Sequence, residues 1–567
     1  EHVTIELFEL PADAGHVVHL SSSRDGLQWR ETVLTPAPLA LDKAMAVFGD
    51  ALAAQAATRP DAEAMVFPQS DARMTFGQWH DRATALARSL LDLGFAPGDH
   101  IAILAESRVE WPVAQLGIAM MGGVMVPLNT YYQRDDLSYA LTQSNAKALF
   151  LSTAFRNSRY LETAQELLPE VPGLKTLIVF GGDHADTEAY DRLITKGATS
   201  TTALPNVSPD AVGSLQYTSG TTGFPKGALL THAGMLANSW GITGRLNVTA
   251  DDRWTSIIPL FHCAGCIMCV LGTVQRGSCY VGVPSFSPTE MFEIVQTEKC
   301  SMLSGVPTSH IAMLEHPDRG QYDLSTMRAG TCGGADTDPD LLRRCAEDFP
   351  LPGVVQVYGQ TEASTLISLA DCAAPERFDT CGPPLPGADV RITDPETGAA
   401  VPTGEIGQIE TSGPMVMRGY YGNPEATAET IGDDGWMRTG DLGYLTAEGN
   451  IVIAGGRLRD MIIRGGENIY PVEIENMLRA HPAVSDIAVF AVPDHYYGEI
   501  VGAAIALAAD TTADELRRYC KGRIAKFKVP ARFYSVTEFP LTASGKIRKT
   551  ELRDMSEAET LRPWDLV

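Results

Sequence analysis

A loop rich in glycine and hydroxyl side chains is the strongest chemical signal in the sequence. Residues 217–227 read YTSGTTGFPKG, in which three Gly and four Ser or Thr surround a single Lys. Glycine lets backbone N–H groups approach an anion, hydroxyls add donors, and lysine adds positive charge. The pattern therefore predicts a phosphate-binding loop. Its spacing differs from the G-x-x-x-x-G-K-[ST] of P-loop nucleotidases, and a flexible surface loop is the alternative.

Four further motifs follow in order along the chain. They are YGQTE at 358–362, RTGDLG at 438–443, GRLRDMIIRGGENIYPVEIE at 456–475 and PLTASGKIRK at 540–549. Together with the first loop, they resemble the adenylate-forming superfamily of acyl-CoA synthetases, peptide-synthetase adenylation domains and beetle luciferases. The resemblance spans residues 45–555. It implies an AMP-forming acyl-CoA synthetase, which converts a carboxylic acid and ATP into an acyl adenylate and pyrophosphate and then transfers the acyl group to CoA.

The resemblance also implies ATP, Mg²⁺ and CoA as ligands and assigns residues to them. The phosphate loop contributes Thr218, Ser219, Gly220, Thr221, Thr222, Gly223 and Lys226. The nucleoside site contributes Gly333, Gly334, Ala335, Tyr358, Asp441 and Arg457. The flat ring of Tyr358 suits adenine, and the carboxylate of Asp441 suits a pair of ribose hydroxyls. Thr361 can donate to the α-phosphate, and Glu362 is the carboxylate expected to bind Mg²⁺.

A second group of residues is expected to act through movement of a small C-terminal domain. Lys546 takes the position of the lysine that bridges the attacking carboxylate and the α-phosphate, where negative charge grows. Rotation of the domain then withdraws Lys546 and brings loop 464–467 to the site. Gly465 and Gly466 leave room for the pantetheine arm of CoA, because a β-carbon would obstruct it. The hinge aligns with Arg459, where the superfamily usually has Asp or Lys, and we expect hinging to survive.

His262 is the candidate for the gate between the acid pocket and the nucleotide, a position that is aromatic or His in the superfamily. Directly after it, Cys263, Cys266 and Cys269 form C-x-x-C-x-x-C, which superficially resembles an iron–sulfur motif. The next cysteine, Cys279, lacks the spacing of such a motif. We therefore favour packing, or lining of the acyl pocket, over a metal site.

The expected acyl pocket, segments 261–268 and 331–335, contains no Lys or Arg. This predicts a fatty or aryl acid without a second charge. The main alternative is an amide-forming ligase that passes the acyl group from the adenylate to an amine. A luciferase-like monooxygenase and a nucleotide sensor without catalysis are further alternatives, and the intact Glu362, Asp441 and Lys546 argue against the sensor. A basic cluster at 517–532 either attracts the nucleotide end of CoA or is a solvated surface.

The elements that must position these residues alternate between helix and strand. Thr75 and Gln78 predict a capping box for a helix that ends at Gly94. Strands are expected at 101–105 and 124–128, with a helical stretch at 109–121 between them. Similar units recur at 147–151 and 177–180. This alternation is typical of a parallel α/β sheet covered on both faces.

The C-terminal third has a different pattern. Residues 380–455 are rich in Gly, Pro and short alternating runs, which favours a β-barrel or sandwich. A small α+β unit follows, with helices near 472–479 and 513–524 and strands at 487–492 and 503–507. We therefore predict an α/β protein with a large N-terminal adenylation domain, residues 1–458, made of α/β subdomains and a β-barrel subdomain. A small, mobile α+β domain, residues 459–567, carries the catalytic lysine.

Composition excludes several classes of function. The 567 residues carry 44 Lys and Arg against 70 Asp and Glu, a net charge of −26 that disfavours nucleic acid and anionic membranes as partners. The first residues lack a signal-peptide pattern, and the longest apolar stretch is too short to span a bilayer. Ten scattered Cys form no disulfide framework. A cytoplasmic enzyme is expected, and a homodimer stays open.

Overall fold

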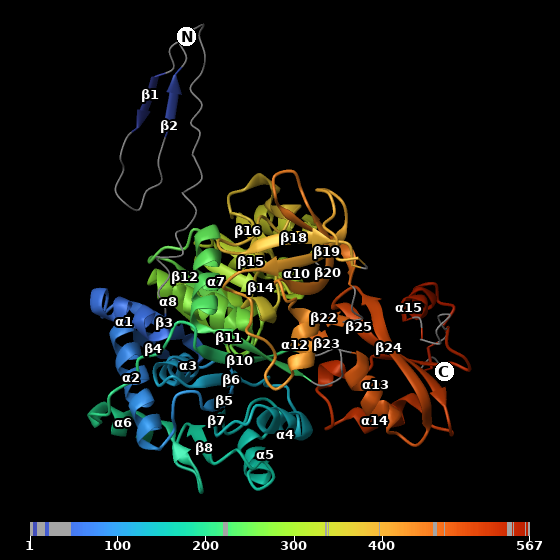
Figure 1. Cartoon of the computed structure of the whole chain (residues 1–567), viewed down its shortest axis with the longest axis horizontal. Helices are drawn as coiled ribbons and strands as arrows, with labels where there is room; N and C mark the ends of the chain where they lie inside the picture. Colours follow the sequence, from blue (N-terminus) through green and yellow to red (C-terminus); the bar gives the residue numbers. More distant parts are fainter. Residues whose placement is uncertain are drawn as a thin grey trace.

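A computed structural model describes residues 4–7, 18–21, 47–218, 225–334, 337, 339–395, 397–457, 462–469, 471–540, 547, 549–561 and 563–564. These residues form a large N-terminal part, which ends at residue 457, and a small C-terminal part, which begins at residue 462 (Figure 1). Ahead of both, β1 (Thr4–Leu7) and β2 (Val18–Ser21) pair as an antiparallel hairpin.

The first half of the N-terminal part contains a seven-stranded sheet of order β11-β10-β6-β5-β7-β8-β9. The β10–β11 pair is antiparallel, and the other neighbouring pairs are parallel. The strands are β5 (His100–Leu104), β6 (Val124–Pro127), β7 (Ala148–Ser152), β8 (Thr176–Phe180), β9 (Glu188–Ala189), β10 (Val212–Thr218) and β11 (Lys226–Thr231). Thr218 and Lys226 are register partners. The two ends of the predicted phosphate loop are therefore held side by side.

A second, eight-stranded sheet has the order β17-β16-β15-β14-β12-β13-β3-β4. Its central pairs are parallel, and the β16–β17 and β3–β4 pairs at its edges are antiparallel. The strands are β3 (Glu63–Phe67), β4 (Ala72–Thr75), β12 (Arg253–Ser256), β13 (Cys279–Gly282), β14 (Met302–Gly305), β15 (Ala329–Gly333), β16 (Gly353–Tyr358) and β17 (Ser368–Leu369). The carboxyl ends of β14, β15 and β16 meet at one edge of the sheet, where α/β proteins commonly bind ligands.

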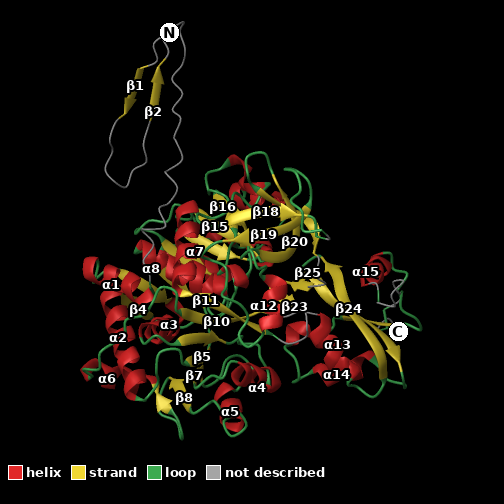
Figure 2. Cartoon of the chain, viewed as in Figure 1, coloured by secondary structure: helices red, strands yellow, loops and turns green. Residues whose placement is uncertain are grey.

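Helices cover both faces of both sheets (Figure 2). A continuous core between the sheets joins Trp79 of α2, Trp111 of α3 and Ile267 of a π-helix to Ile101 of β5 and Trp254 of β12. Side chains of α4 and α5 cover the outer face of the first sheet, and those of α9, α10 and α11 cover the outer face of the second. The predicted parallel α/β architecture is confirmed.

The helices of the N-terminal part are α1 (Phe48–Thr58), α2 (Phe76–Asp92), α3 (Glu110–Met120), α4 (Arg134–Gln143), α5 (Tyr160–Leu167), α6 (Tyr190–Thr199), α7 (His232–Arg245), the π-helix η3 (Ala264–Leu271), α8 (Gly272–Arg276), α9 (Pro288–Glu298), α10 (Pro307–Leu314), α11 (Pro339–Glu347) and α12 (Pro424–Thr430). Its 3₁₀ turns are η2 (Pro68–Ser70), η4 (Arg319–Gln321), η5 (Thr361–Ala363) and η6 (Pro375–Phe378). Helix α2 begins with the predicted capping box, in which the Thr75 hydroxyl accepts from the Gln78 N–H and the Gln78 side chain accepts from the Thr75 N–H.

The Gly- and Pro-rich stretch forms an antiparallel sheet of four strands in sequence order, β18 (Asp389–Thr393), β19 (Gly407–Ser412), β20 (Met437–Leu445) and β21 (Ile451–Arg457). Within the described residues its two edge strands do not pair with each other, so this sheet is open. Asp441 of β20 is the register partner of Arg457 of β21. The two predicted ribose ligands therefore lie on neighbouring strands.

The C-terminal part is a small α+β unit with its own core. Its five strands are β22 (Ile462–Arg464), β23 (Glu467–Ile469), β24 (Val484–Asp494), β25 (Gly498–Leu507) and β26 (Arg532–Ser535). Its helices are α13 (Pro471–Arg479), α14 (Ala513–Cys520), α15 (Lys549–Glu557) and the 3₁₀ turn η7 (Lys526–Lys528). Leu478, Val489 and Leu516 lie in one buried cluster that packs α13 and α14 against the sheet. Among the described residues, no helix is long and apolar enough to cross a membrane.

Candidate active site

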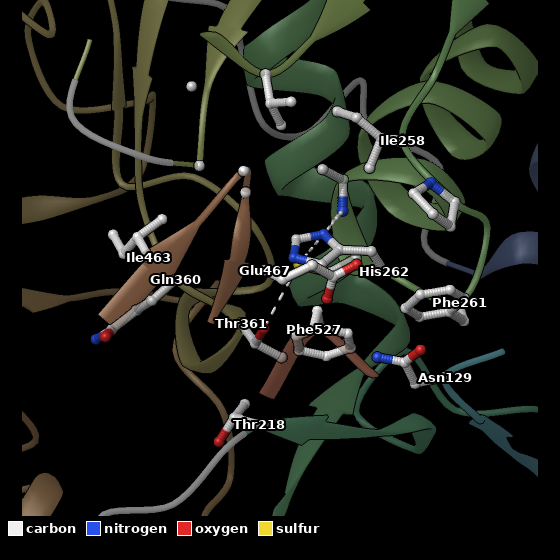
Figure 3. A pocket seen from close by; sticks show the side chains of 18 of the residues that line it. Asn129, Thr218, Ile258, Phe261, His262, Gln360, Thr361, Ile463, Glu467 and Phe527 are labelled. Carbon is white, nitrogen blue, oxygen red and sulfur yellow. Dashed lines mark hydrogen bonds between the residues drawn. The ribbon is translucent and has the colours of Figure 1, made fainter. Parts of the chain in front are cut away.

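A cavity of about 1000 Å³ lies between the N-terminal and C-terminal parts (Figure 3). The N-terminal part contributes the carboxyl ends of β14, β15 and β16, and the C-terminal part contributes the turn between β22 and β23 together with η7. Many of the predicted site residues line this one cavity: Thr218, Lys226, His262, Gly333, Gly334, Tyr358, Thr361, Glu362, Asp441, Gly465 and Gly466. Segments far apart in the sequence therefore converge on one space.

Glu362 is a buried carboxylate, 7% exposed, in the short turn η5. Its Oε1 accepts hydrogen bonds from the Tyr420 hydroxyl at 2.7 Å and the Thr218 hydroxyl at 3.2 Å. The Nζ of Lys226 lies 5.2 Å from the centre of the Tyr420 ring. This cluster combines a carboxylate, two hydroxyls and a cation beside the ends of the phosphate loop, as the binding of a metal–phosphate group requires.

Tyr420 was missed by sequence reasoning, because it lies in none of the five motifs. Its contact with Glu362 spans 58 positions of sequence. Its only sequence signal is the Tyr-Tyr-Gly-Asn-Pro turn that precedes α12.

The side of the cavity where the sequence predicts the nucleoside site is built around Tyr358 and Asp441. The Tyr358 hydroxyl donates to Asp441 Oδ2 at 3.2 Å, and the pKa of Tyr358 is raised well above its usual value by burial and by the Asp441 carboxylate. The tyrosine therefore remains a neutral donor. Gly334 has a φ of +83°, and a β-carbon built on it would meet nothing nearer than Val306 at 3.8 Å. The glycine thus suits a left-handed backbone beside open space.

His262, Thr361 and Glu467 lie close together in the cavity (Figure 3), and Cys263 lines it beside Thr361. His262 Nδ1 accepts from the Ala264 N–H at 3.2 Å, which leaves Nε2 to carry the proton of the neutral ring. Burial favours the neutral imidazole, but Cys263 and Glu467 outweigh it and raise the pKa of His262. Burial raises the pKa of the Glu467 carboxyl, and the His262 and Lys528 charges oppose that shift. The charge of each group therefore favours the charged form of the other.

The turn between β22 and β23 projects into the cavity from the C-terminal part. Gly465 has a φ of +57° and Gly466 a φ of +86°. A β-carbon on Gly466 would lie 2.6 Å from Val306 Cγ1, and one on Gly465 would lie 3.3 Å from Tyr497 Cδ1. The predicted approach of this loop to the site is thus present in the structure, and the contact leaves no space for a side chain at position 466.

Some predicted residues lie outside the described residues. They are Ser219, Gly220, Thr221, Thr222, Gly223, Ala335, Arg459 and Lys546, together with the side chain of Arg457. The structure thus places neither the interior of the phosphate loop nor the predicted catalytic lysine.

The three cysteines of the run are buried in one core cluster, and the first of them also lines the cavity. All ten cysteines are free, and Cys266 and Cys269 are buried in the core between the sheets. Cys263 lines the cavity. No group of three or more His, Cys, Asp and Glu side chains that could hold a metal occurs in the described part of the chain. A cation at Glu362 would therefore need oxygens from its nucleotide, which is usual for Mg²⁺.

Comparison with protein families agrees with this geometry. The profile of the AMP-binding enzyme family matches residues 52–421, and that of the AMP-binding enzyme C-terminal domain matches residues 473–546. The chain belongs to the AMP-binding enzyme family. The resemblance to the adenylate-forming superfamily is confirmed, and the chain is an AMP-forming acid–CoA ligase of that family.

Relatives in the AMP-binding enzyme family carry synthetase and ligase names. The chain is 40% identical to YngI of Bacillus subtilis, named provisionally as an acyl-CoA synthetase, over 87% of the chain and 94% of that protein. It is 34% identical to the mitochondrial medium-chain acyl-CoA ligase ACSF2 of Bos taurus, over 90% of the chain and 87% of that protein.

The solved structures that are similar to this chain include enzymes whose names give different acyl acceptors. The o-succinylbenzoate CoA synthetase MenE of Bacillus subtilis superposes with a TM-score of 0.77 at 29% identity, over 89% of this chain and 98% of that chain. The amide bond synthetase McbA of Marinactinospora thermotolerans superposes with a TM-score of 0.79 at 26% identity, over 90% and 99%.

The contact between Gly466 and Val306 predicts a selective defect. Gly466→Ala adds a β-carbon that clashes in the observed orientation and strains a left-handed backbone, which costs roughly 1–2 kcal/mol. We expect formation of acyl-CoA from supplied acyl adenylate to fall at least about tenfold, while acid-dependent pyrophosphate release is retained.

Gly522→Ala is the matched control, because Gly522 also has a positive φ, +81°, but a β-carbon there meets no atom within 4 Å. In that variant, the rate of acyl-CoA formation from supplied acyl adenylate should keep its ratio to the rate of acid-dependent pyrophosphate release. Equal losses of both steps in Gly466→Ala would contradict the prediction.

Proposed function

We propose that this acid–CoA ligase activates an apolar carboxylic acid with ATP in the cavity between its two parts, and that the residues converging there carry both steps. The observation that carries the proposal is the convergence of Thr218, Lys226, Glu362, Tyr358 and Asp441 on one cavity that the glycine turn enters. In the first step an acid oxygen attacks the α-phosphorus and pyrophosphate leaves. In the second, the CoA sulfur attacks the carbonyl carbon and AMP leaves.

For the first step, the chain must bring together two anions. Lys226 would pair with the departing phosphates, and Thr361 would donate to the α-phosphate. Glu362, held by two hydroxyls, would bind Mg²⁺, which when bound neutralises phosphate charge. Lys546 would bridge the acid and the α-phosphate when the C-terminal part is rotated from its observed position.

For the second step, the observed orientation of the C-terminal part is the relevant one. Gly465 and Gly466 would form the wall along which the pantetheine arm passes. The CoA thiol must lose its proton to become a nucleophile, and His262 and Glu467, which both line the cavity, would accept it. Closure by the turn also keeps water away from the reactive adenylate.

The acid is proposed to be a fatty or aryl acid. The cavity wall around the π-helix is formed by apolar side chains, namely Ile257, Ile258, Phe261, Met268, Val283 and Phe286. A charged tail there would be buried without a partner, which is costly. The name of the bovine relative, a medium-chain acyl-CoA ligase, supports a medium-chain fatty acid.

Amide formation is the second candidate, because the similarity to the amide bond synthetase McbA is as close in fold as that to the CoA synthetase MenE.

We further propose that the two domains divide between residues 458 and 459. Cytoplasmic location stays a prediction from the sequence. A homodimer stays a possibility that the sequence raises and does not decide.

The first experiment is a panel of acids with ATP, followed by identification of the acyl product. We expect pyrophosphate release with medium-chain or aryl acids, and an acyl-CoA rather than an amide when CoA and amines compete at equal concentration. Product masses distinguish the acceptors. An amide as the main product would transfer the assignment to the second candidate, and absence of pyrophosphate release with every acid would refute adenylation.

Glu362→Gln should impair adenylation by removing the negative charge that binds Mg²⁺. We expect pyrophosphate release to fall by about 10²- to 10³-fold and to require more Mg²⁺. Tyr420→Phe is the matched control, since it removes a hydrogen bond to Glu362 but leaves the carboxylate, and its loss should be smaller. An unchanged Mg²⁺ requirement in Glu362→Gln would count against the metal role.

Lys546→Ala should separate the two half-reactions in the opposite sense to Gly466→Ala. Loss of the bridging cation should lower adenylation by about 10²- to 10³-fold, while CoA transfer from supplied acyl adenylate continues. Lys521→Ala, a change at an exposed lysine of the same part, should leave both steps intact. If transfer and adenylation fall together in Lys546→Ala, the division of labour is wrong.

A further inference from the structure

The C-terminal part contacts the N-terminal part at a second place besides the glycine turn. Phe527 of η7 projects into the cavity (Figure 3), and its ring centre lies 5.7 Å from that of Tyr131, with an angle of 86° between the ring planes. Aromatic pairs prefer this edge-to-face arrangement. Beside it, Lys528 Nζ lies 6.0 Å from the centre of the Tyr132 ring. The turn η7 thus rests on residues 131–132, and we call this contact the η7 seat.

The N-terminal half of the seat is held in place by its own turn. The Tyr131 N–H donates to Asn129 Oδ1 at 2.9 Å, and the Tyr132 N–H donates to the Asn129 carbonyl at 3.0 Å. The Tyr131 hydroxyl accepts from the Arg156 guanidinium, whose carbon lies 5.1 Å from the centre of the Tyr131 ring. Because these contacts lie within the N-terminal part, the ring is ordered before η7 docks, and docking loses little conformational entropy there.

The C-terminal half of the seat is joined to the glycine turn by Arg464, the residue before Gly465. Arg464 Nη1 donates to the Phe527 carbonyl at 3.2 Å, and the guanidinium carbon lies 4.3 Å from the centre of the Tyr497 ring. Gly465 lies against the same ring, since a β-carbon on it would be 3.3 Å from Tyr497 Cδ1. A hydrogen bond from a charged donor is stronger than one between neutral groups. The position of η7 therefore sets the position of the glycine turn.

We propose that Tyr131, Phe527 and Arg464 are positioning residues for the transfer of the acyl group to CoA. The Tyr131–Phe527 ring pair holds the C-terminal part in the observed orientation, and Arg464 transmits that position to the glycine turn, along which the pantetheine arm passes. The inference rests on the proposed function, which assigns the observed orientation to the transfer step. Adenylation uses another orientation, in which the ring pair is apart. The η7 seat therefore supports one half-reaction and not the other.

The test supplies chemically prepared octanoyl-AMP and, in parallel, benzoyl-AMP to the full chain and measures two reactions of the same adenylate. With CoA, acyl-CoA formation measures transfer. With pyrophosphate and Mg²⁺, ATP formation measures adenylation in reverse. Tyr131→Ala and Phe527→Ala should each lower the maximal transfer rate at saturating CoA by about three- to tenfold and leave the rate of ATP formation within about twofold. Retained ATP formation also shows that each variant folds.

Further variants test whether the two rings act together. The double variant Tyr131→Ala/Phe527→Ala should lose no more transfer than the weaker of the two single variants, because residues in contact are not independent. Tyr131→Phe keeps the ring and should keep transfer. Arg464→Ala should lower the maximal transfer rate and not the rate of ATP formation. Tyr322→Ala is the matched control: it removes a half-buried ring, 5.3 Å from that of Phe292 and away from the cavity, and should leave both reactions unchanged.

The inference is overturned if the losses multiply in the double variant, or if transfer and ATP formation fall together in the Ala variants. It is also overturned if the maximal transfer rate stays unchanged, whether or not the KM for CoA rises. In each of these cases the unchanged chain still performs both reactions, so the proposed function stands and this inference alone is removed. If the unchanged chain fails in either reaction with both adenylates, the proposed function is refuted, and this inference with it.

Discussion

The close packing of the Gly466 turn against Val306 is the constraint on which the rest of the site depends. The turn belongs to the C-terminal part and Val306 to the N-terminal part, so this contact is one of those through which the two parts meet, as is the contact between the Tyr131 and Phe527 rings. It also presents Glu467 to His262, since the carboxylate follows the turn directly. The turn therefore forms part of the cavity wall and brings the Glu467 carboxylate to the cavity. A backbone that can adopt a positive φ without a β-carbon is the only kind that fits both demands.

The second constraint on the site is that charged side chains buried at the cavity need partners of opposite charge close by. The protein has a net charge of −26 and yet is proposed to bind ATP, an acid and CoA, which are all anions. In the described residues, the N-terminal part lines the cavity with the cations Arg156 and Lys226. The cations from the C-terminal part have carboxylate partners there, as Lys528 has in Glu473 at 2.6 Å and Lys549 in Glu475 at 2.8 Å.

Much of the fold and site could be predicted from the sequence, because local signals and motif order carry the information. The Thr75 capping box and the alternation of helices with apolar strands depend on neighbours in sequence, and they were predicted correctly. Thr218, Tyr358, Glu362 and Asp441 were found from ordered motifs, and the structure brings them to one cavity. The α14 helix, expected to continue to residue 524, ends at Cys520, where residues 521–524 form a turn.

What could not be predicted depends on contacts between distant segments. Tyr420 holds Glu362 across 58 positions, and no local pattern encodes that pairing. Lys528 appeared in the sequence as one of a basic cluster that either attracts CoA or is solvated. It is instead 4% exposed and bonded to Glu473. Its charge is satisfied inside the protein, so it adds little attraction for an anion.

These charge pairings explain why a moving lysine is useful. A permanent unpaired cation in the cavity would have to be buried without a partner whenever substrates were absent, and that is costly. A lysine on a mobile part can stay hydrated until ATP and the acid are bound, and then enter between two anions that compensate its desolvation. After the adenylate forms, the carboxylate and the α-phosphate are joined in a single monoanion and pyrophosphate has left, so the attraction that would hold the lysine weakens. We propose that its withdrawal then makes way for the glycine turn.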